Sequence, residues 1–453
     1  MPTMTRRVTL TGWGRTEPTA AEFAEPQSPD DVAGLVKGVA HGGVIARGLG
    51  RSYNNAAQND GGLVISTSGM RDVLSFDPQS GVVTCEAGVS LEQLMTDLLP
   101  SGWFVPVSPG TRKVTVGGAI AADVHGKNHH SSGSFARHVL SFELLTADGA
   151  ARMVTPESDP DLFWATAGGM GLTGIILRAT ISMKKVDTSR LIVDTVRTAN
   201  IDDAMAHLTA TDKDYEYTVA WTDCLATRGS LGRSIITSGD FAKVDDLRNR
   251  ARGKPLAFRP SALAGAPAVF PSGLMNARTV SLLNEAYFRK APRHRSGEIQ
   301  AIGKFFHPLD AITNWNRVYG PAGFRQYQYV VPFAASDVVL RSLERISALQ
   351  APSFVTVVKR FGAGDPGMLS FPIPGWTLAL DFPARTPWLS QLCAELDEMV
   401  LEAGGRLYLA KDSRIPAGLM PKMYPRLEDF RRVRAQVDPA GLFSSDLSRR
   451  LEL

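Results

Sequence analysis

The segment Pro109-Gly-Thr-Arg-Lys-Val-Thr-Val-Gly-Gly-Ala-Ile-Ala-Ala122 decides how this chain is interpreted. Its last residues are nearly all Gly and Ala, so a large planar or anionic ligand can lie directly against the backbone. A second glycine-rich segment, Arg47-Gly-Leu-Gly-Arg-Ser-Tyr-Asn-Asn55, follows the apolar run Val44-Ile45-Ala46. Glycines straight after a strand let backbone N–H groups converge on a phosphate. Each segment alone is also compatible with a plain tight turn, so the prediction of a nucleotide site rests on the pair.

The bulk composition limits the class of protein. The 453 residues exceed one ordinary hydrophobic core, which favours two domains. With 44% hydrophobic and 21% charged residues the chain is typical of a globular protein, and its net charge of +4 argues against a nucleic-acid partner. Cys85, Cys224 and Cys393 form no CxxC pair, so neither a disulfide framework nor a zinc site is predicted. We also expect no transmembrane helix and no signal peptide, because the apolar runs are too short.

The pattern of the sequence changes near residue 190. Before it, short β-branched runs alternate with glycine-rich turns, without the regular βαβ alternation of a Rossmann domain. After it, strand-like segments such as Tyr217–Trp221 and Gln326–Val331 are widely spaced, and a helix is predicted over 388–403. The whole is a mixed α+β pattern.

A long loop is predicted over 253–275, a stretch rich in Pro, Gly and Ala. An apolar loop beside cations suits contact with an anionic lipid surface, and a plain surface loop is the alternative. We therefore expect peripheral membrane contact through residues 256–295. The apolar residues of the loop are Phe258, Val269, Phe270 and Leu274, and the basic cluster that follows is Arg289, Lys290, Arg293 and Arg295.

Two further motifs complete the pattern. Gly168-Gly-Met-Gly-Leu-Thr-Gly-Ile-Ile176 follows Phe163-Trp164, and Arg432-Val-Arg-Ala-Gln-Val-Asp-Pro-Ala-Gly-Leu-Phe443 lies near the C-terminus. In this order, these motifs and the first two resemble the vanillyl-alcohol-oxidase family of FAD-dependent oxidoreductases. The resemblance implies a two-domain α+β fold. Its parts would be a PCMH-type FAD-binding domain at 1–188, a substrate-binding domain built on an antiparallel sheet at 189–405, and a segment at 406–453 that returns to the first domain.

The resemblance also implies which residues contact FAD. Covalent members of the family carry a flavin-linking His where this chain has Arg51, so non-covalent FAD is expected. The residues carried over as cofactor-binding are Arg47, Gly48, Gly50, Arg51, Ser52, Tyr53, Gly110, Thr111, Gly117, Gly118, Ala122, His125, Gly126, Asn128, Gly171, Gly174, Ile175, Tyr408 and Lys411.

A narrower resemblance covers nearly the whole chain. It is to family members that form the flavin subunit of actinobacterial sugar-lipid 2′-epimerases. It implies oxidation of the 2′-hydroxyl of a decaprenyl-phosphoryl ribofuranose to a ketone, the first step towards the arabinose epimer for cell-wall arabinan. It also implies an NAD(P)H-dependent keto-reductase partner and a place at the cell envelope, peripheral to the plasma membrane. It does not indicate on which side of the membrane the protein lies. The motifs that carry it are Val124–Phe135, Phe305–Asp310, Tyr319–Phe324, Leu407-Tyr-Leu-Ala-Lys-Asp-Ser-Arg414 and Arg449–Leu453.

Lys411 and His125 are carried over as catalytic residues. An ordinary lysine has a pKa of about 10.4 and is a poor base at neutral pH. Lys411 is therefore either a base whose pKa is lowered by its surroundings, or a group that orients the hydroxyl and offsets charge on the cofactor. A surface lysine beside Asp412 is the alternative. The residues carried over as substrate-binding are Lys127, Trp221, Phe306, Gln326, Gln328, Lys359, Phe361, Thr377 and Ala379.

Some features leave other interpretations open. Phe306 stands where the resembling enzymes have Tyr, and Thr377-Leu-Ala379 stands where they have Asn-x-Cys. His125, His129 and His130 resemble a metal motif, but no carboxylate joins them, so no metal is predicted. The competing functions are an FAD oxidase of free sugars, alditols or aldonolactones, and a non-catalytic flavoprotein that assists another enzyme.

Overall fold

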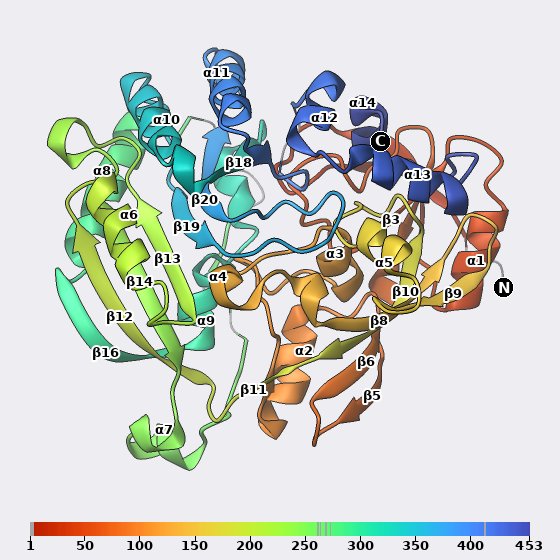
Figure 1. Cartoon of the computed structure of the whole chain (residues 1–453), viewed down its shortest axis with the longest axis horizontal. Coiled ribbons are helices and arrows are strands. Elements are labelled where there is room, and N and C mark those ends of the chain that lie inside the picture. The colour runs from red at the N-terminus through yellow and green to blue at the C-terminus, as the bar shows by residue number, and fades with distance from the viewer. Residues whose placement is uncertain (1–3, 261, 263, 268–269, 272, 412–413) are drawn as a thin grey trace.

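The computed structural model describes residues 4–453 apart from 261, 263, 268–269, 272 and 412–413 (Figure 1). Val269 and Asp412 therefore lie outside the described residues. The molecule has two halves that lie side by side. The N-terminal part of the chain and the C-terminal helices form one half, and the middle of the chain forms the other (Figure 1).

The first half contains two main sheets and a short two-stranded one of β7 Trp103–Phe104 and β11 Lys184–Lys185. A mixed sheet has the order β1-β2-β4-β3, with β1 Arg6–Leu10, β2 Thr19–Ala24, β3 Val44–Arg47 and β4 Leu63–Ser66. An antiparallel sheet has the order β5-β6-β10-β8-β9, with β5 Val73–Asp77, β6 Val82–Glu86, β8 Val139–Leu145, β9 Ala151–Val154 and β10 Ile175–Ser182. The helices of this half that matter here are α2 Leu91–Leu98, α3 Val116–Ala121, α4 His129–Ser132 and α5 Pro160–Thr166. The first glycine-rich segment leaves β3, the second enters α3, and the third joins α5 to β10.

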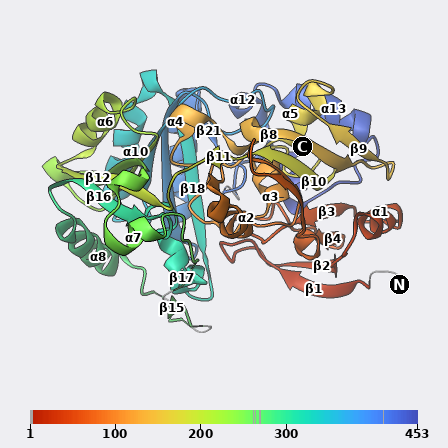
Figure 2. The ribbon, with the colours of Figure 1, turned by 90° about the horizontal axis from the view of Figure 1, so that it is seen from below.

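The second half is built on one sheet in which every strand pairing is antiparallel, as predicted. Its order is β16-β12-β14-β13-β19-β20-β18-β21. The bounds are β12 Arg190–Thr198, β13 Tyr217–Thr222, β14 Ser234–Phe241, β16 His294–Ala301, β18 Phe324–Pro332, β19 Val357–Phe361, β20 Gly375–Pro383 and β21 Arg406–Leu407. The helices packed with it include α6 Ile201–Ala210, α8 Ala277–Lys290, α10 Asp337–Ala348 and α11 Leu389–Glu402. Figure 2 shows α6 and α10 on the side of the sheet that is turned away from the first half.

The alternating sequence of β18 gives the sheet two different faces. Side chains along a strand point to opposite sides in turn. Tyr327 and Tyr329 therefore point to one side, where the Tyr327 hydroxyl donates to Asp397 of α11 (2.7 Å) and the Tyr329 hydroxyl donates to Ser342 of α10 (3.0 Å). Gln326 and Gln328 point to the other side, towards the first half of the molecule.

The C-terminal segment packs against the first half. Helix α13, Leu427–Val437, contacts α5, and Phe443 forms a β-bridge with Val44 at the start of β3. Leu407 lies in β21, the edge strand of the large sheet, so the chain crosses between the halves directly after this strand. The return of the C-terminus is thus present in the structure, and the domain boundaries themselves stay a prediction.

The predicted helix over 388–403 is confirmed as α11, and Gly404 follows it in the left-handed region at a φ of +68°. Within 253–275, the described residues hold only the last residue of α7, Asn249–Gly253, and the short strand β15, Ala264–Gly265. The basic cluster begins on α8, so part of the predicted membrane-binding stretch is helical. Among the described residues, no helix is long and apolar enough to cross a bilayer.

Candidate active site

One face of the large sheet gathers most of the predicted substrate residues. In the strand register, Gln328 lies beside Ala379, Ala379 beside Val357, and Val357 beside Trp221. Cross-strand neighbours share a face, and so do residues two apart along one strand. The face therefore carries Trp221, Gln326, Gln328, Lys359, Phe361, Thr377, Ala379 and Asp381 from four adjacent strands.

His125, from the segment between α3 and α4, is bonded to this face. The Thr377 hydroxyl donates to the Tyr329 carbonyl (2.7 Å), so its oxygen accepts from the Gln328 amide (3.2 Å). The same amide nitrogen lies 3.0 Å from Nε2 of His125, which must then accept. The proton of the neutral imidazole therefore sits on Nδ1, which is buried and has no hydrogen-bond partner within the described part of the chain.

The surroundings of His125 keep its ring uncharged. Burial holds the pKa of His125 well below its usual value, and the cations Lys359 and Lys411 and the His129 ring lower it further. Aromatic rings form the wall around it, with centroids 4.8 to 5.5 Å away; they belong to Phe361, Phe371 and Tyr408. A neutral histidine can orient a hydroxyl or a cofactor but cannot hold a second proton at neutral pH.

Lys411 follows β21 and faces the first glycine-rich segment. Its Nζ lies 3.7 Å from the centroid of the Tyr53 ring. The two segments are tied by the Tyr53 N–H, which donates to the Ala410 carbonyl (2.9 Å), and by the Asn54 side chain, which donates to the Leu409 carbonyl (2.6 Å). Lys411 is thus a half-buried residue in a fixed place, and the interpretation as a simple surface lysine does not fit.

The lysines of the site have lowered pKa values. Burial lowers the pKa of Lys411 to about 7, while Asp381 opposes this shift and Lys359 adds to it. Burial lowers the pKa of Lys359 to about 8. Burial and the charge of Lys359 lower the pKa of Lys127 to about 7; its Nζ donates to the Phe305 carbonyl and lies 4.3 Å from the Phe305 ring. Three such amines around one face favour an anionic ligand.

Asp381 is a member of this face that the sequence analysis missed. Its Oδ1 accepts from the Gln326 side chain (2.5 Å), and its backbone N–H donates to the Ser353 hydroxyl (2.9 Å). Burial raises the pKa of this carboxyl to about 7, while Gln326 and Lys411 act to lower it. The signal was present in the sequence, because Asp381 continues the alternation of Thr377 and Ala379 along one strand.

The glycines of the first two glycine-rich segments have two different roles. A Cβ added at Gly110 would meet nothing within 4 Å, whereas one at Gly48 would lie 2.2 Å from the Thr115 hydroxyl, and one at Gly117 2.9 Å from Ala87. Gly110 thus borders open space, and the other two allow close packing around the start of α3. The Thr115 hydroxyl accepts from the Gly118 N–H and caps that helix.

Eight further predicted cofactor residues fall into three groups. Gly50 and Gly171 need the left-handed conformation, with φ of +63° and +81°. Three residues use their own polar groups to hold loops: Arg47 donates to Thr11 and Ala57, Ser52 accepts from Trp13, and Tyr408 donates to Ala122. Three pack closely: Gly126 against Ser108, Gly174 against Leu145, and Ile175 in the core beside β3.

Unpaired polar atoms agree with a large polar ligand at this place. Arg51 Nε, His125 Nδ1 and Asn128 Oδ1 are buried and lack a hydrogen-bond partner among the described residues. The Arg51 guanidinium also stacks on Trp13, 3.8 Å from the ring centroid. Buried polar groups are normally paired, so three of them among the predicted FAD contacts fit a polar cofactor.

Residues far away in the sequence hold the loop that begins the second glycine-rich segment. The Thr111 hydroxyl donates to Asp310 (2.7 Å), as does the Arg112 N–H (2.9 Å), and Ser108 pairs with His307 (2.7 Å). Of the Phe305–Asp310 motif, the sequence assigned a role to Phe306 but none to His307 or Asp310. Local periodicity cannot find these contacts, because the partners are almost 200 residues apart.

Two predicted substrate residues lie towards the margin of the face. Phe306 is buried in an aromatic cluster, with ring centroids 4.9 Å from Tyr217 and 5.4 Å from Phe104. Trp221 donates from its indole N–H to the Phe354 carbonyl (2.9 Å) and contacts Tyr287 of α8, with centroids 4.8 Å apart. Both positions are apolar, and their roles in substrate binding stay predictions.

The other histidines of the motif have protein partners. His129 Nδ1 accepts from the Gly362 N–H (3.2 Å), and His130 Nε2 lies 2.9 Å from the Tyr215 carbonyl. No group of three or more metal-binding side chains occurs in the described ranges.

Comparison with known proteins adds the family to this geometry. A family model described as an FAD binding domain matches residues 20–155, and one described as D-arabinono-1,4-lactone oxidase matches residues 323–451. Decaprenylphosphoryl-beta-D-ribose oxidase of Mycolicibacterium smegmatis is 48% identical over 100% of this chain and 98% of its own. An uncharacterized protein of Streptomyces coelicolor is 42% identical over 81% of this chain and 100% of its own. L-gulonolactone oxidase 3 of Arabidopsis thaliana is 22% identical over 85% and 72%.

The fold, the site and these matches define an FAD-dependent oxidoreductase with the two-domain α+β fold of the vanillyl-alcohol-oxidase type. Within that class, the chain belongs to the family of decaprenylphosphoryl-β-D-ribose oxidase. The predicted cofactor, FAD, is thereby confirmed, and the roles of individual site residues stay predictions.

Proposed function

We propose that the protein oxidises the 2′-hydroxyl of decaprenylphosphoryl-β-D-ribose to the 2′-keto sugar. The observation that carries this proposal is a sheet face that combines a neutral His125–Gln328 pair with three amines of lowered pKa. Such a face suits a sugar that bears an anionic phosphate. The similarity over the full chain to an enzyme named for this substrate supports the same conclusion.

The residues have separate roles in this proposal. Lys411, with a pKa of about 7, accepts the proton of the 2′-hydroxyl, and His125 and Gln328 orient the ring. Lys127 and Lys359 hold the phosphate. Bound FAD supplies the hydride acceptor, and the chemistry of that acceptor is the cofactor's own. We infer that FAD is not covalently attached, because Arg51 replaces the linking His; acid precipitation should release the yellow colour, and flavin that stays with the polypeptide would contradict this.

A second candidate is an oxidase of free sugars or aldonolactones. It is favoured by the match of residues 323–451 to the D-arabinono-1,4-lactone oxidase model. A screen under anaerobic conditions separates the two, with loss of flavin absorbance as the signal. Reduction by polyprenyl-phosphoryl ribose but not by ribose or a lactone supports the first function, and the reverse supports the second. No reduction by any pentoside would revive the non-catalytic flavoprotein.

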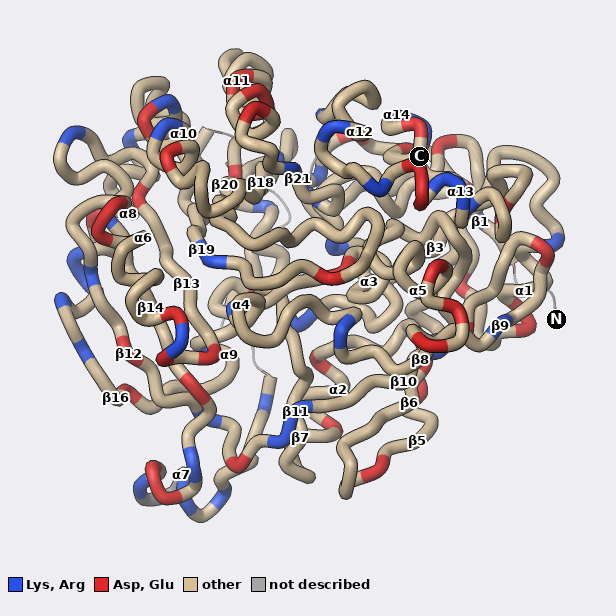
Figure 3. The backbone as a smooth tube through the Cα atoms, in the orientation of Figure 1, with Lys and Arg blue, Asp and Glu red and all other residues tan. Residues whose placement is uncertain are grey.

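We propose that α8 and the basic cluster form the membrane contact. On α8, Asn284 is buried and donates to Asp223 (2.7 Å), while Leu282, Leu283 and Tyr287 are exposed at 71%, 42% and 47%. Figure 3 shows basic residues beside this helix along β16. Because Tyr287 contacts Trp221, the helix also links the surface to the site, which suits a lipid-linked substrate.

Vesicle sedimentation tests this contact. The double variant Leu282→Ser, Leu283→Ser should lose binding to phosphatidylglycerol vesicles, and Leu74→Ser, at an exposed leucine on β5, should not. Binding by the native chain should weaken with salt, since each basic residue near such a surface contributes about 1 kcal/mol. Equal binding by the double variant would contradict the assignment.

The proposed product requires a second enzyme. A 2′-keto sugar becomes the arabinose epimer by reduction, so we propose an NAD(P)H-dependent keto-reductase as partner and a cell-envelope location for both. A mixture of the two proteins should convert the ribose lipid to the arabinose lipid. Accumulation of the ketone in the presence of the reductase and NAD(P)H would contradict the partnership.

A further inference from the structure

Asp381 lies inside the proposed site but has no part in the roles given above. Its carboxyl is buried on the same sheet face as Gln328 and Ala379, in direct register with Gln326. Oδ1 accepts from Gln326, and the buried Oδ2 has no hydrogen-bond partner in the described ranges. Burying a carboxyl in this way is unfavourable, so a structural reason or a functional one is needed.

The contacts around Asp381 lead to Lys411. Gln326 donates to Asp381, and two residues earlier on the same face of β18 Phe324 packs edge-on against the Tyr53 ring, with centroids 5.4 Å apart. The ring of the same Tyr53 lies under Nζ of Lys411 at 3.7 Å. Among the described residues, Asp381 is the opposite charge that acts on Lys411, and no described carboxylate forms an ion pair with the amine directly.

We propose that Asp381 is a positioning residue that sets the charge state of Lys411 across the Gln326–Tyr53 cluster. The inference rests on the proposed function, in which Lys411 accepts the hydroxyl proton. Once it has done so, Lys411 is a cation, and Asp381 stabilises that cation without touching the substrate. Opposite charges at short range shift each other's protonation by about one to three pH units.

The other charged groups that face the pair act in known directions. Lys359 on β19 opposes the protonation of Lys411, and the ring of His125 is uncharged. Tyr53 and Tyr319 pack against Phe324 at the start of β18, and burial raises the pKa of both phenols well above the usual value, so they stay neutral. Among the described residues, Asp381 is thus the group that favours protonated Lys411, and its removal should move the titration of Lys411 to lower pH.

The test measures that titration without turnover. The FAD-loaded protein is treated with trace acetic anhydride over a range of pH, and the acetylation of Lys411 is read by peptide mass spectrometry. In Asp381→Asn the pH midpoint of labelling should fall by about one unit or more. Asp397→Asn is the matched control, because it removes another buried carboxyl, on the opposite side of β18, and should leave the midpoint unchanged.

Several outcomes overturn the proposal. One is a midpoint in Asp381→Asn that is unmoved or moves to higher pH. Another is loss of folding in both Asp381→Asn and Asp381→Leu while Asp397→Asn folds, which would make the carboxyl purely structural. The pH profile of flavin reduction by substrate is a second readout and should shift in the same direction. If labelling shifts but no ribose lipid reduces the flavin, the pair is confirmed and the proposed function is wrong.

Discussion

Both sides of β18 bury polar groups, but the hydrogen bonding of these groups differs between the two sides. On the helix side, Tyr327 and Tyr329 donate to Asp397 and Ser342. On the site side, His125 Nδ1 and Asp381 Oδ2 are buried and unpaired, as far as the described residues go. An unpaired buried polar group costs about 1 to 3 kcal/mol. One strand therefore carries a side that stabilises the fold and a side that is kept ready for ligands.

Replacement of Lys411 should have the largest effect on the site side. Lys411→Ala should retain FAD but lose flavin reduction by substrate, since a general base contributes about 10²- to 10⁴-fold. Stopped-flow absorbance of the purified variant measures the rate. A loss of less than tenfold would show that the role of Lys411 is misassigned.

A matched pair of substitutions compares the two sides directly. Gln328→Leu removes the amide that bonds His125 and Thr377, and we expect a loss in reduction rate of about tenfold or more, because one hydrogen bond of about 1.5 kcal/mol corresponds to that factor. Tyr327→Phe, the next residue on the other side, should lower the free energy of unfolding by about 1 to 3 kcal/mol.

One result of this comparison would contradict the account. If Tyr327→Phe slows flavin reduction as much as Gln328→Leu, the division of labour between the two sides is wrong. Thermal unfolding with flavin fluorescence as the signal provides the stability comparison for both variants.

Part of this contrast can be predicted from the sequence, and part cannot. The alternation in Gln326–Val331 predicts a strand with one polar and one apolar side, and helix α11 follows from its apolar spacing. The sequence does not reveal that Gln326 would meet Asp381, or Ser108 meet His307, because these pairs form only when distant segments fold together. The resemblance places Phe306 in the pocket, a role that stays a prediction, and the sequence does not reveal that its ring would pack beside Tyr217 and Phe104.

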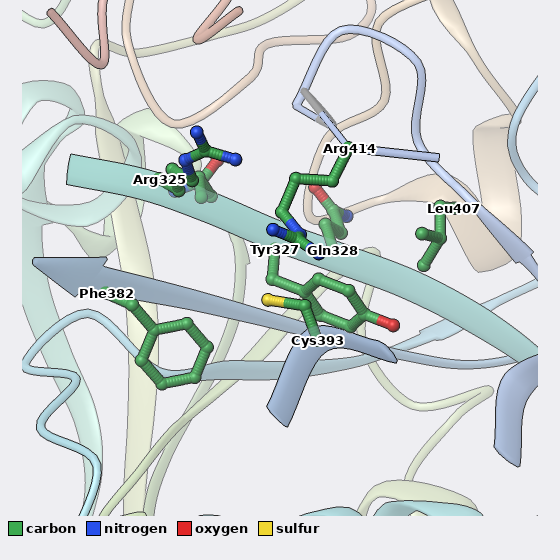
Figure 4. Close-up of a pocket in the computed structure, with 8 residues that line it drawn as sticks. Arg325, Tyr327, Gln328, Phe382, Cys393, Leu407 and Arg414 are labelled. Carbon is green, nitrogen blue, oxygen red and sulfur yellow. The ribbon is translucent and has the colours of Figure 1, made fainter. Parts of the chain in front are cut away.

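The smallest expected effect on turnover concerns Ala379. Resembling enzymes have a cysteine here, and covalent capture of a nitroaromatic inhibitor needs a thiolate. Figure 4 shows Tyr327 and Gln328 leaving β18 in opposite directions, with Cys393 beside Tyr327. Cys393 thus lies on the helix side and cannot replace the missing thiol. We expect no adduct on the native chain and an adduct on Ala379→Cys, with little change in turnover.

Intact-mass analysis after turnover with a nitroaromatic compound checks this expectation. Ala379→Ser is the control, because it adds a small polar group without a thiol. An adduct on the native chain, or none on Ala379→Cys, would mean that Ala379 does not face the reaction site.

The central claim is that the site side of the large sheet oxidises a phosphate-bearing ribose lipid. Anaerobic mixing of the FAD-loaded protein with decaprenylphosphoryl ribose, followed by flavin absorbance, tests it most directly. The account predicts rapid bleaching with this substrate, slow or no bleaching with free ribose, and none in Lys411→Ala. Equal bleaching by free ribose and by the ribose lipid, or bleaching that survives in Lys411→Ala, would contradict it.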